Sequence, residues 1–277
     1  APWPIEKIEL EWTVRGRGLK EKAVRDAVRL AEEKYCSVSA SMTSELVTTV
    51  RVLNEDEGEA ELVTGEWTAL QADMRACRQC LEAGHQIAPG AVFSGPAPAP
   101  LMLVGQAPGI TEAQVKRPFN ASSGTRLFQW MAEAGLEEID FRARYYMTAV
   151  TKCYPGKQPS GKGDRKPSRA VQKLCRPFLE RELALVQPRV LLAVGGLAIE
   201  TLLSQKRRLD ESVGRVFEVD GRRILPLPHP SGASLWPNRP ENQALLQQAL
   251  VLLREELVPY LSGGLESVPA PDGESFS

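Results

Sequence analysis

The chain has 277 residues, of which 43% are hydrophobic, so it is long enough to form about two domains with buried cores. Its 34 basic and 35 acidic residues nearly balance, so no overall field of one sign marks a nucleic-acid-binding protein. No apolar run approaches the ~20 residues of a membrane span, and the first residues lack the basic and apolar stretches of a signal peptide. Five cysteines without such a signal indicate cytoplasmic thiols or metal ligands rather than disulfides. The chain begins with Ala1 instead of Met, so we expect it to be a trimmed piece of a longer one.

The first part of the chain shows a strand pattern, a helix pattern and a second strand pattern. Residues 5–14 alternate apolar and charged side chains, residues 19–36 place an apolar stripe on one helical face, and residues 45–54 are β-branched and alternating. Residues 1–58 are therefore predicted to form a small β-α-β unit. An acidic run then predicts a linker or entry segment at 59–75.

The stretch EKYCSVSASM at the end of the first predicted helix carries Cys36. With this stretch, residues 1–58 resemble the C-terminal half of the OsmC/Ohr family of peroxide-reducing proteins. That family uses two cysteines, and the half of its fold that carries the other one is absent here. A thiol peroxidase is one alternative that the resemblance implies. The other is a packed cysteine in an element that serves docking or dimerisation.

From about residue 76 onward, short apolar strands alternate with amphipathic helices. Strands are expected at 101–105, 144–152 and 189–195 and in a hairpin that turns at Asp220–Gly221, with helices at 124–136, 168–187, 196–204 and 241–257. This alternation predicts an α/β domain at 76–258, a three-layer αβα sandwich around a four-stranded parallel sheet. Residues 259–277 are expected to be a disordered tail.

The loops after the predicted strands carry distinctive sequences. GQAPG follows the first strand, KCYPG the second, GG the third and HPS the last. Because the carboxyl ends of parallel strands meet at the edge where open sheets bind ligands, we expect these four loops to converge on one crevice. The function of the chain is therefore expected at this edge.

Four cysteines have the spacing of a metal site. Cys77 and Cys80 form a Cys-x-x-Cys pair, and Cys153 and Cys175 follow as single residues. The pair brings two thiolates to one site, and the later two complete a four-sulfur set that suits either zinc or an iron–sulfur cluster. Such a site would join the N-terminal segment, the end of a strand and a helix.

These motifs together resemble the iron–sulfur, family 4 type branch of the uracil-DNA glycosylase superfamily over roughly residues 75–255. The likeness is carried by VGQAPGITEAQVKRPFNASSGTRL (104–127), YMTAVTKCYP (146–155) and HPS (229–231). The four cysteines also follow the order of the family's cluster ligands, so the resemblance implies a [4Fe–4S] cluster, with zinc as the runner-up. It implies a monofunctional DNA repair glycosylase, which flips uracil or a related deaminated base out of single- or double-stranded DNA and hydrolyses its glycosidic bond.

The resemblance also implies roles for single residues. His229 would donate to uracil O2 and stabilise the leaving anion, and Phe119 would stack on the base. Gln106 and its loop would position the base or the attacking water. Ser231 would contact a phosphate, and Leu235 or Trp236 would fill the gap that the flipped base leaves. The other residues expected to bind the substrate are Gly105, Ala107, Pro108, Gly109 and Ala149.

Several positions depart from the family pattern, and NASSG (120–124) replaces the family's Val-Gly-x-Ala-Gly. Ala149 stands where the family has an Asn that reads the uracil edge, Gln106 stands where family 4 has Glu, and Lys116 replaces a Gly. Strict uracil preference is therefore not expected, and a broader range of deaminated bases is open. A glycosylase-like DNA-binding module with impaired catalysis is the main alternative.

The segment between Cys153 and Cys175 is longer than is usual for family 4. Its basic residues outnumber its acidic ones, and Lys162, Arg165 and Lys166 are expected to contact DNA phosphates beside the crevice, with a solvated charged loop as the alternative. The segment lacks the reactive His of covalent-trapping relatives, so no covalent DNA adduct is expected. GKQPSGKG (156–163) nearly matches a nucleotide-binding loop, but Gly163 replaces the hydroxyl residue that would bind Mg²⁺.

Overall fold

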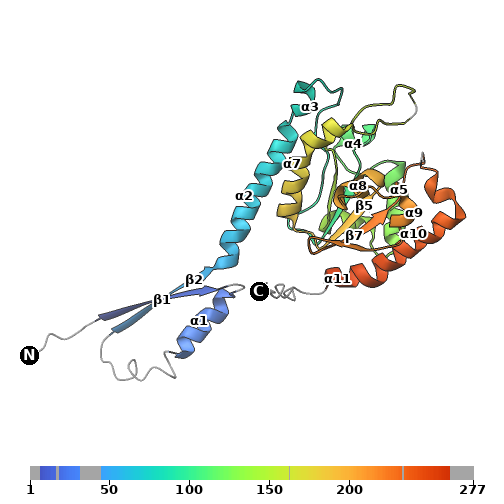
Figure 1. Ribbon diagram of the computed structural model, residues 1–277. Coiled ribbons are helices and arrows are strands. Elements are labelled where there is room, and N and C mark those ends of the chain that lie inside the picture. The colour runs from blue at the N-terminus through green and yellow to red at the C-terminus, as the bar shows by residue number, and fades with distance from the viewer. Residues whose placement is uncertain (1–6, 17–18, 32–44, 162, 233, 263–277) are drawn as a thin grey trace, which may run out of the picture. The chain divides into compact units, whose positions relative to one another are not determined.

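The computed structural model describes residues 7–16, 19–31, 45–161, 163–232 and 234–262 (Figure 1). The chain divides into two compact units, residues 1–66 and residues 67–277. Among the described residues, no helix is both long and apolar enough to cross a membrane.

The first unit contains the β-α-β arrangement that the sequence pattern predicts. Strand β1 (Lys7–Gly16) pairs in parallel with β2 (Glu45–Asn54), and helix α1 (Glu21–Leu30) lies between them in the chain. A parallel pair needs such a crossover connection, because a tight turn can join only antiparallel strands. Cys36, on which the peroxidase alternative depends, lies outside the described residues.

The segment expected to be a linker is helical instead. Helix α2 (Glu55–Ala76) covers it, and from Trp67 onward its buried side chains are Trp67, Leu70 and Met74. Their spacing of three and four residues is that of one buried helical face. The prediction failed because many acidic residues precede this short apolar stripe and dominate the composition.

The second unit is built on a five-stranded sheet with the order β4-β3-β5-β7-β6. The strands are β3 (Leu101–Gly105), β4 (Tyr146–Ala149), β5 (Val190–Val194), β6 (Phe217–Val219) and β7 (Arg222–Leu227). Four of them run in parallel, as predicted, and β6 adds an antiparallel edge strand. The hairpin of β6 and β7 turns at Asp220 and Gly221, which both have positive φ.

Alternate residues of the central strands face opposite layers. On β3, Leu101 and Leu103 belong to one core, and Met102 and Val104 belong to the other. The first core is covered by α5 (Ser122–Glu133), α6 (Glu138–Arg144) and α10 (Pro240–Leu252). The second is covered by the end of α2, α7 (Arg169–Val186) and α8 (Gly196–Leu202) (Figure 1). The predicted three-layer αβα sandwich is thus confirmed.

Short helical segments complete this unit. They are α3 (Gln79–Glu82), α4 (Ile110–Val115), α9 (Leu209–Ser212), η3 (Trp236–Asn238), the π-helical η4 (Leu253–Leu257) and α11 (Val258–Ser262). The predicted tail is wrong for its first residues, since Leu261 of α11 is buried and its carbonyl accepts a hydrogen bond of 2.7 Å from Arg189. The apolar pattern of α10 therefore continues into the region that we expected to be disordered.

Candidate active site and cysteine pocket

The carboxyl ends of the parallel strands border a cleft of 550 Å³. All four strand-end loops reach it, as the sequence pattern predicts. The predicted site residues that line it are Gly105, Gln106, Ala107, Pro108, Gly109, Phe119, Ala149, Arg165, His229 and Ser231. A cleft of this size is in the range of pockets that bind small molecules.

Phe119 is held in the cleft wall from several sides. Its backbone has a φ of 50°, its N–H donates to Glu112, and its carbonyl accepts a hydrogen bond of 2.8 Å from Arg142. Arg142 also donates to the carbonyl of Pro118 at 2.9 Å. The ring lies against Gly105, where an added Cβ would stand 3.2 Å from Phe119 Cζ. A strained conformation that so many contacts support is typical of a functional position.

Glu112 joins the GQAPG loop to the Phe119 segment. Its carboxylate accepts the backbone N–H of Gly109 with one oxygen and that of Phe119 with the other. Burial raises the pKa of Glu112 above its ordinary value, the two N–H groups oppose this rise, and Asp164 adds to it. The sequence analysis gave Glu112 no role, although it lies inside the GQAPG-containing motif.

His229 follows β7 and is half-buried. Its Nδ1 accepts a hydrogen bond of 3.2 Å from the N–H of Ser231, so the neutral ring carries its proton on Nε2. Burial lowers the pKa of His229 below its ordinary value, which favours this neutral form. Gly195, with a φ of +88°, lies so close that an added Cβ would stand 3.3 Å from His229 Cδ2. The site thus holds a neutral imidazole whose donor is Nε2–H.

The GQAPG loop is fixed to the segment that follows β4. The N–H of Val150 donates to the carbonyl of Gly105 at 2.9 Å, and the N–H of Thr151 donates to that of Gln106 at 3.3 Å. Ala149, at the end of β4, is buried and lines the cleft. The cleft wall therefore has a methyl group at the end of β4.

The long segment after Cys153 reaches the cleft through Asp164 and Arg165. The Arg165 guanidinium donates to the carbonyls of Pro155 at 2.8 Å and Gln86 at 2.6 Å, so it holds the segment in place. Asp164 accepts a hydrogen bond of 2.9 Å from Tyr154. The sequence analysis did not assign Asp164 to the cleft, because nothing in the local pattern shows where the segment folds.

The remaining predicted DNA contacts differ in their surroundings. Lys166 is exposed, and Lys162 lies outside the described residues. Leu235 is 72% exposed, whereas Trp236 is partly buried and packs against the core. Of the two residues expected to fill the gap that the flipped base leaves, only Leu235 is thus an exposed apolar side chain. The stretch at 156–163 nearly matches a nucleotide-binding loop in sequence, but in the described part of the chain no helix follows it directly, since α7 begins only at Arg169.

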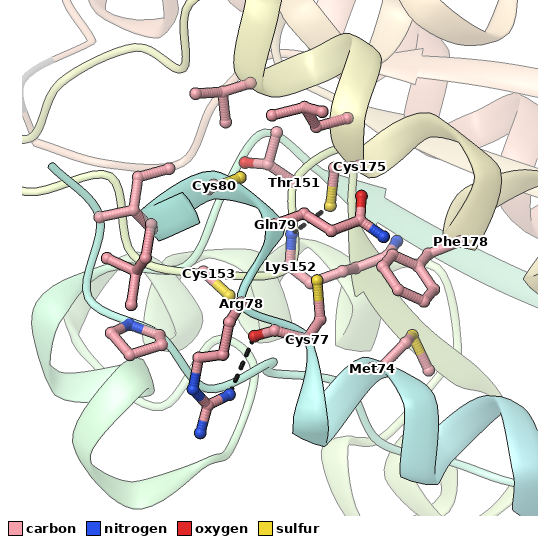
Figure 2. Close-up of a pocket in the computed structure, with 15 residues that line it drawn as sticks. Met74, Cys77, Arg78, Gln79, Cys80, Thr151, Lys152, Cys153, Cys175 and Phe178 are labelled. Atoms are coloured by element: carbon pink, nitrogen blue, oxygen red, sulfur yellow. Dashed lines mark hydrogen bonds between the residues drawn. The ribbon is translucent and has the colours of Figure 1, made fainter. Parts of the chain in front are cut away.

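Cys77, Cys80, Cys153 and Cys175 line a single pocket (Figure 2). Cys77 follows α2, Cys80 lies on α3, Cys153 follows β4, and Cys175 lies on α7. The rest of the lining is mainly apolar and includes Met74. The three segments that the cysteine spacing was expected to join do meet in this pocket.

The thiols of Cys80, Cys153 and Cys175 lie in surroundings that disfavour their charged form. Burial raises the pKa of Cys80 and Cys153, and neighbouring thiols add to the rise. Burial also raises the pKa of Cys175 to about 11, while the N–H of Lys152 donates to its Sγ at 3.3 Å. Among the described residues, no three His, Cys, Asp or Glu side chains are arranged to hold a metal ion.

A buried ion pair lies between the cysteine pocket and the cleft. Lys152 Nζ is 2.5 Å from the carboxylate of Glu182, and the two residues are 2% and 0% exposed. Glu182 also accepts hydrogen bonds from Tyr146 at 2.7 Å and Thr148 at 2.9 Å. Lys152 donates further to the carbonyl of Ala149 at 2.6 Å. The network fixes the end of β4, and the sequence analysis missed it.

The chain matches the model of the uracil DNA glycosylase superfamily over residues 92–254. The curated relatives include three type-4 uracil-DNA glycosylases. The one from Pyrobaculum aerophilum is 29% identical over 116 residues, which cover 42% of this chain and only 54% of the relative. Those from Sulfurisphaera tokodaii and Archaeoglobus fulgidus are 25% and 26% identical, over 60% of this chain and over 77% and 81% of the relatives. Because this match covers more than half of the 277 residues of the chain, the chain belongs to the uracil DNA glycosylase superfamily.

Proposed function

We propose that this chain is a monofunctional DNA glycosylase, which removes uracil or a related deaminated base from DNA by hydrolysis and leaves an abasic site. One observation carries the proposal: Phe119 and His229, from distant segments, line the same cleft. An extruded base needs an aromatic face to stack on and a hydrogen-bond donor that stabilises the negative charge on the departing base.

Phe119 would hold the extruded base by stacking. Its backbone is fixed by Glu112 and Arg142, so the ring is positioned before the base arrives. Such positioning lowers the barrier because the orientation of the base does not have to be restricted at the moment of reaction.

His229 would stabilise the leaving base. As the glycosidic bond breaks, negative charge develops on the base, and Nε2–H of the neutral imidazole would donate to uracil O2. A preorganised donor of this kind typically contributes about 2.7–4 kcal/mol to the transition state. The hydrogen bond from Ser231 to Nδ1 supports this role, because it keeps the proton on Nε2.

Gln106 would orient the attacking water. Its amide can donate and accept hydrogen bonds, but unlike a carboxylate it cannot take a proton at neutral pH. More of the rate enhancement is therefore expected from leaving-group stabilisation by His229 than from activation of the water.

Ala149 broadens the range of bases that we expect. A site that reads an edge by hydrogen bonds can reject analogues by about 10⁴–10⁵-fold, whereas an apolar wall discriminates far less. The test is a panel of duplexes that carry uracil, hypoxanthine, xanthine or a normal base, assayed for abasic sites. Release of at least one deaminated base supports the proposal. Binding to DNA without any release supports the impaired module instead.

The rest of the DNA interface is proposed from position and charge. Leu235, the exposed apolar tip, would enter the gap that the base leaves, and Ser231 would contact a phosphate. Lys166 and Lys162 would follow the backbone of the strand. A cytoplasmic location is proposed with this function.

We also propose that Cys77, Cys80, Cys153 and Cys175 hold a [4Fe–4S] cluster. The donor set fits: four sulfurs line one mainly apolar pocket, and a backbone N–H already donates to Cys175. When bound, the cluster would supply the positive charge that ionises these thiols and would join three segments of the chain. Purified protein should then be brown and contain iron and sulfide, whereas a colourless sample that contains zinc would contradict the assignment.

For residues 1–58 the OsmC-like resemblance remains a proposal, which the parallel β1–β2 pair supports in outline. Turnover of an organic hydroperoxide that is abolished by Cys36→Ser would support a thiol peroxidase. Absence of turnover would leave a docking or dimerisation element.

A further inference from the structure

A third cavity, of 310 Å³, is lined by Arg75, Gly90, Ala91, Phe93 and Lys116. Two of these residues are cationic and none is acidic. The role proposed above for the 550 Å³ cleft uses none of them.

Both cations are held without a carboxylate. The Arg75 guanidinium lies over the ring of Phe93, 5.2 Å from its centroid, and donates to the side-chain amide of Gln71 at 3.3 Å. Lys116 donates to the carbonyl of Gly90 at 3.1 Å. Within the described part of the chain, the hydrogen-bond partners of these two cations are thus neutral.

Gly90 allows Lys116 to lie in this place. It has a φ of +116°, and an added Cβ would collide with Lys116 Nζ. Gly90 and Lys116 together therefore place a cation at the cavity.

The cavity shares two backbone segments with the cleft. Val92, which lies between Ala91 and Phe93 in the chain, lines the cleft, and so does Pro118, two residues after Lys116. Neighbouring residues along a chain are 3.8 Å apart. The two cations therefore lie close to the cleft, within reach of a DNA strand whose nucleotide enters it.

We infer that this cavity binds a backbone phosphate of the DNA strand, next to the nucleotide whose base enters the cleft. Arg75 and Lys116 would neutralise the phosphate, and Phe93 would hold the guanidinium flat. The inference rests on the proposed function, because it takes DNA as the ligand.

The test compares the salt dependence of DNA binding in four proteins. They are the unmodified chain, the double variant Arg75→Gln/Lys116→Gln, the variant Phe93→Leu and the control Lys206→Gln, which removes an exposed charge outside all three cavities. Fluorescence anisotropy with a labelled oligonucleotide gives the slope of log Kobs against log salt. Loss of one phosphate contact lowers the magnitude of this slope by about 1. We expect that change for the double variant and little change for Lys206→Gln.

Phe93→Leu separates charge from packing. It should weaken binding while it leaves the slope nearly unchanged, because both cations remain. A further comparison uses two kinds of oligonucleotide, one that extends only to the 5′ side of the uracil and one that extends only to the 3′ side. The change of slope in the double variant should appear with only one of the two, because the cavity lies next to one flanking phosphate.

An unchanged slope in the double variant overturns the inference, and so does an unmodified chain that does not bind DNA. Titration with inorganic phosphate distinguishes a site for free phosphate. If the double variant loses phosphate binding but keeps the DNA slope, the cavity binds free phosphate, and the inference is overturned. Base release by the unmodified chain is measured separately. The proposed function can therefore fail while the phosphate site is supported, and the phosphate site can fail while the proposed function is supported.

Discussion

The carboxylate of Glu112 accepts the backbone N–H of Phe119 and also that of Gly109, so one side chain sets the distance between the GQAPG loop and the aromatic wall of the cleft. Phe119 also has a positive φ, which such contacts must maintain.

Glu112→Gln should therefore lower kcat/KM for base release. A Gln offers one acceptor oxygen instead of two, so one buried N–H loses its partner at a cost of about 1–3 kcal/mol. This corresponds to a loss of roughly 5- to 150-fold, with 1.4 kcal/mol for each factor of ten. Glu218→Gln, at an exposed position of β6, is the control. Equal activity of the two variants would show that Glu112 does not position Phe119.

Gly195→Ala should impair catalysis beyond its effect on stability. Gly195 has a φ of +88°, and an added Cβ would stand 3.3 Å from the His229 ring. Gly221→Ala is a matched control, since its φ is +71° and an added Cβ would meet nothing within 4 Å. Both changes should cost about 1–3 kcal/mol of stability through backbone strain. Only Gly195→Ala should lower kcat, and a similar loss in both variants would contradict the role of this contact.

The stability of the protein should depend on His229 at acidic pH. Burial lowers the pKa of His229, so below the ordinary value of 6.5 the unfolded chain binds a proton before the folded chain does. The contribution of His229 to stability therefore falls as the pH drops from 6.5 toward the lower, folded pKa, and this contribution is constant at higher pH. His229→Gln should flatten this part of a profile of Tm against pH. His85→Gln, which changes the other of the two histidines, serves as the comparison. An unchanged profile in His229→Gln would show that the ring is not buried in its neutral form.

Lys152→Met should destabilise the fold strongly. It leaves the fully buried Glu182 carboxylate without its cation, and breaking such a pair typically costs about 3–5 kcal/mol. Lys152→Met/Glu182→Leu should recover part of this loss, because it removes both charges. Arg176→Gln, which breaks the exposed pair with Glu180, should cost at most about 1 kcal/mol. Urea unfolding measures all three, and a small effect of Lys152→Met would mean that the pair is not buried in solution.

The sequence predicted the site through features that are local in the chain. Each strand-end loop is a continuous stretch, and the rule that parallel strands present their carboxyl ends at one edge placed Gln106 and His229 together. Phe119 was added by the resemblance to the glycosylase family, and it lines the same cleft. The cysteines were found in the same way, since their spacing is visible without a fold.

What the sequence analysis missed depends on contacts between distant residues. The partners of Lys152 lie on β4 and α7, and no periodicity shows that a lysine and a glutamate will be buried against each other. The linker prediction failed at α2 because composition outweighed the short stripe of Trp67, Leu70 and Met74. Trp236 was not separated from Leu235, since adjacent residues can face the core and the solvent in turn.

Base release from a duplex with a single uracil decides the role of His229. It is measured as abasic sites under single-turnover conditions for the unmodified chain and for His229→Ala. We expect the unmodified chain to release the base and His229→Ala to be about 10²–10³-fold slower, while it still binds the duplex. Release by His229→Ala at the unmodified rate would show that His229 does not stabilise the leaving base.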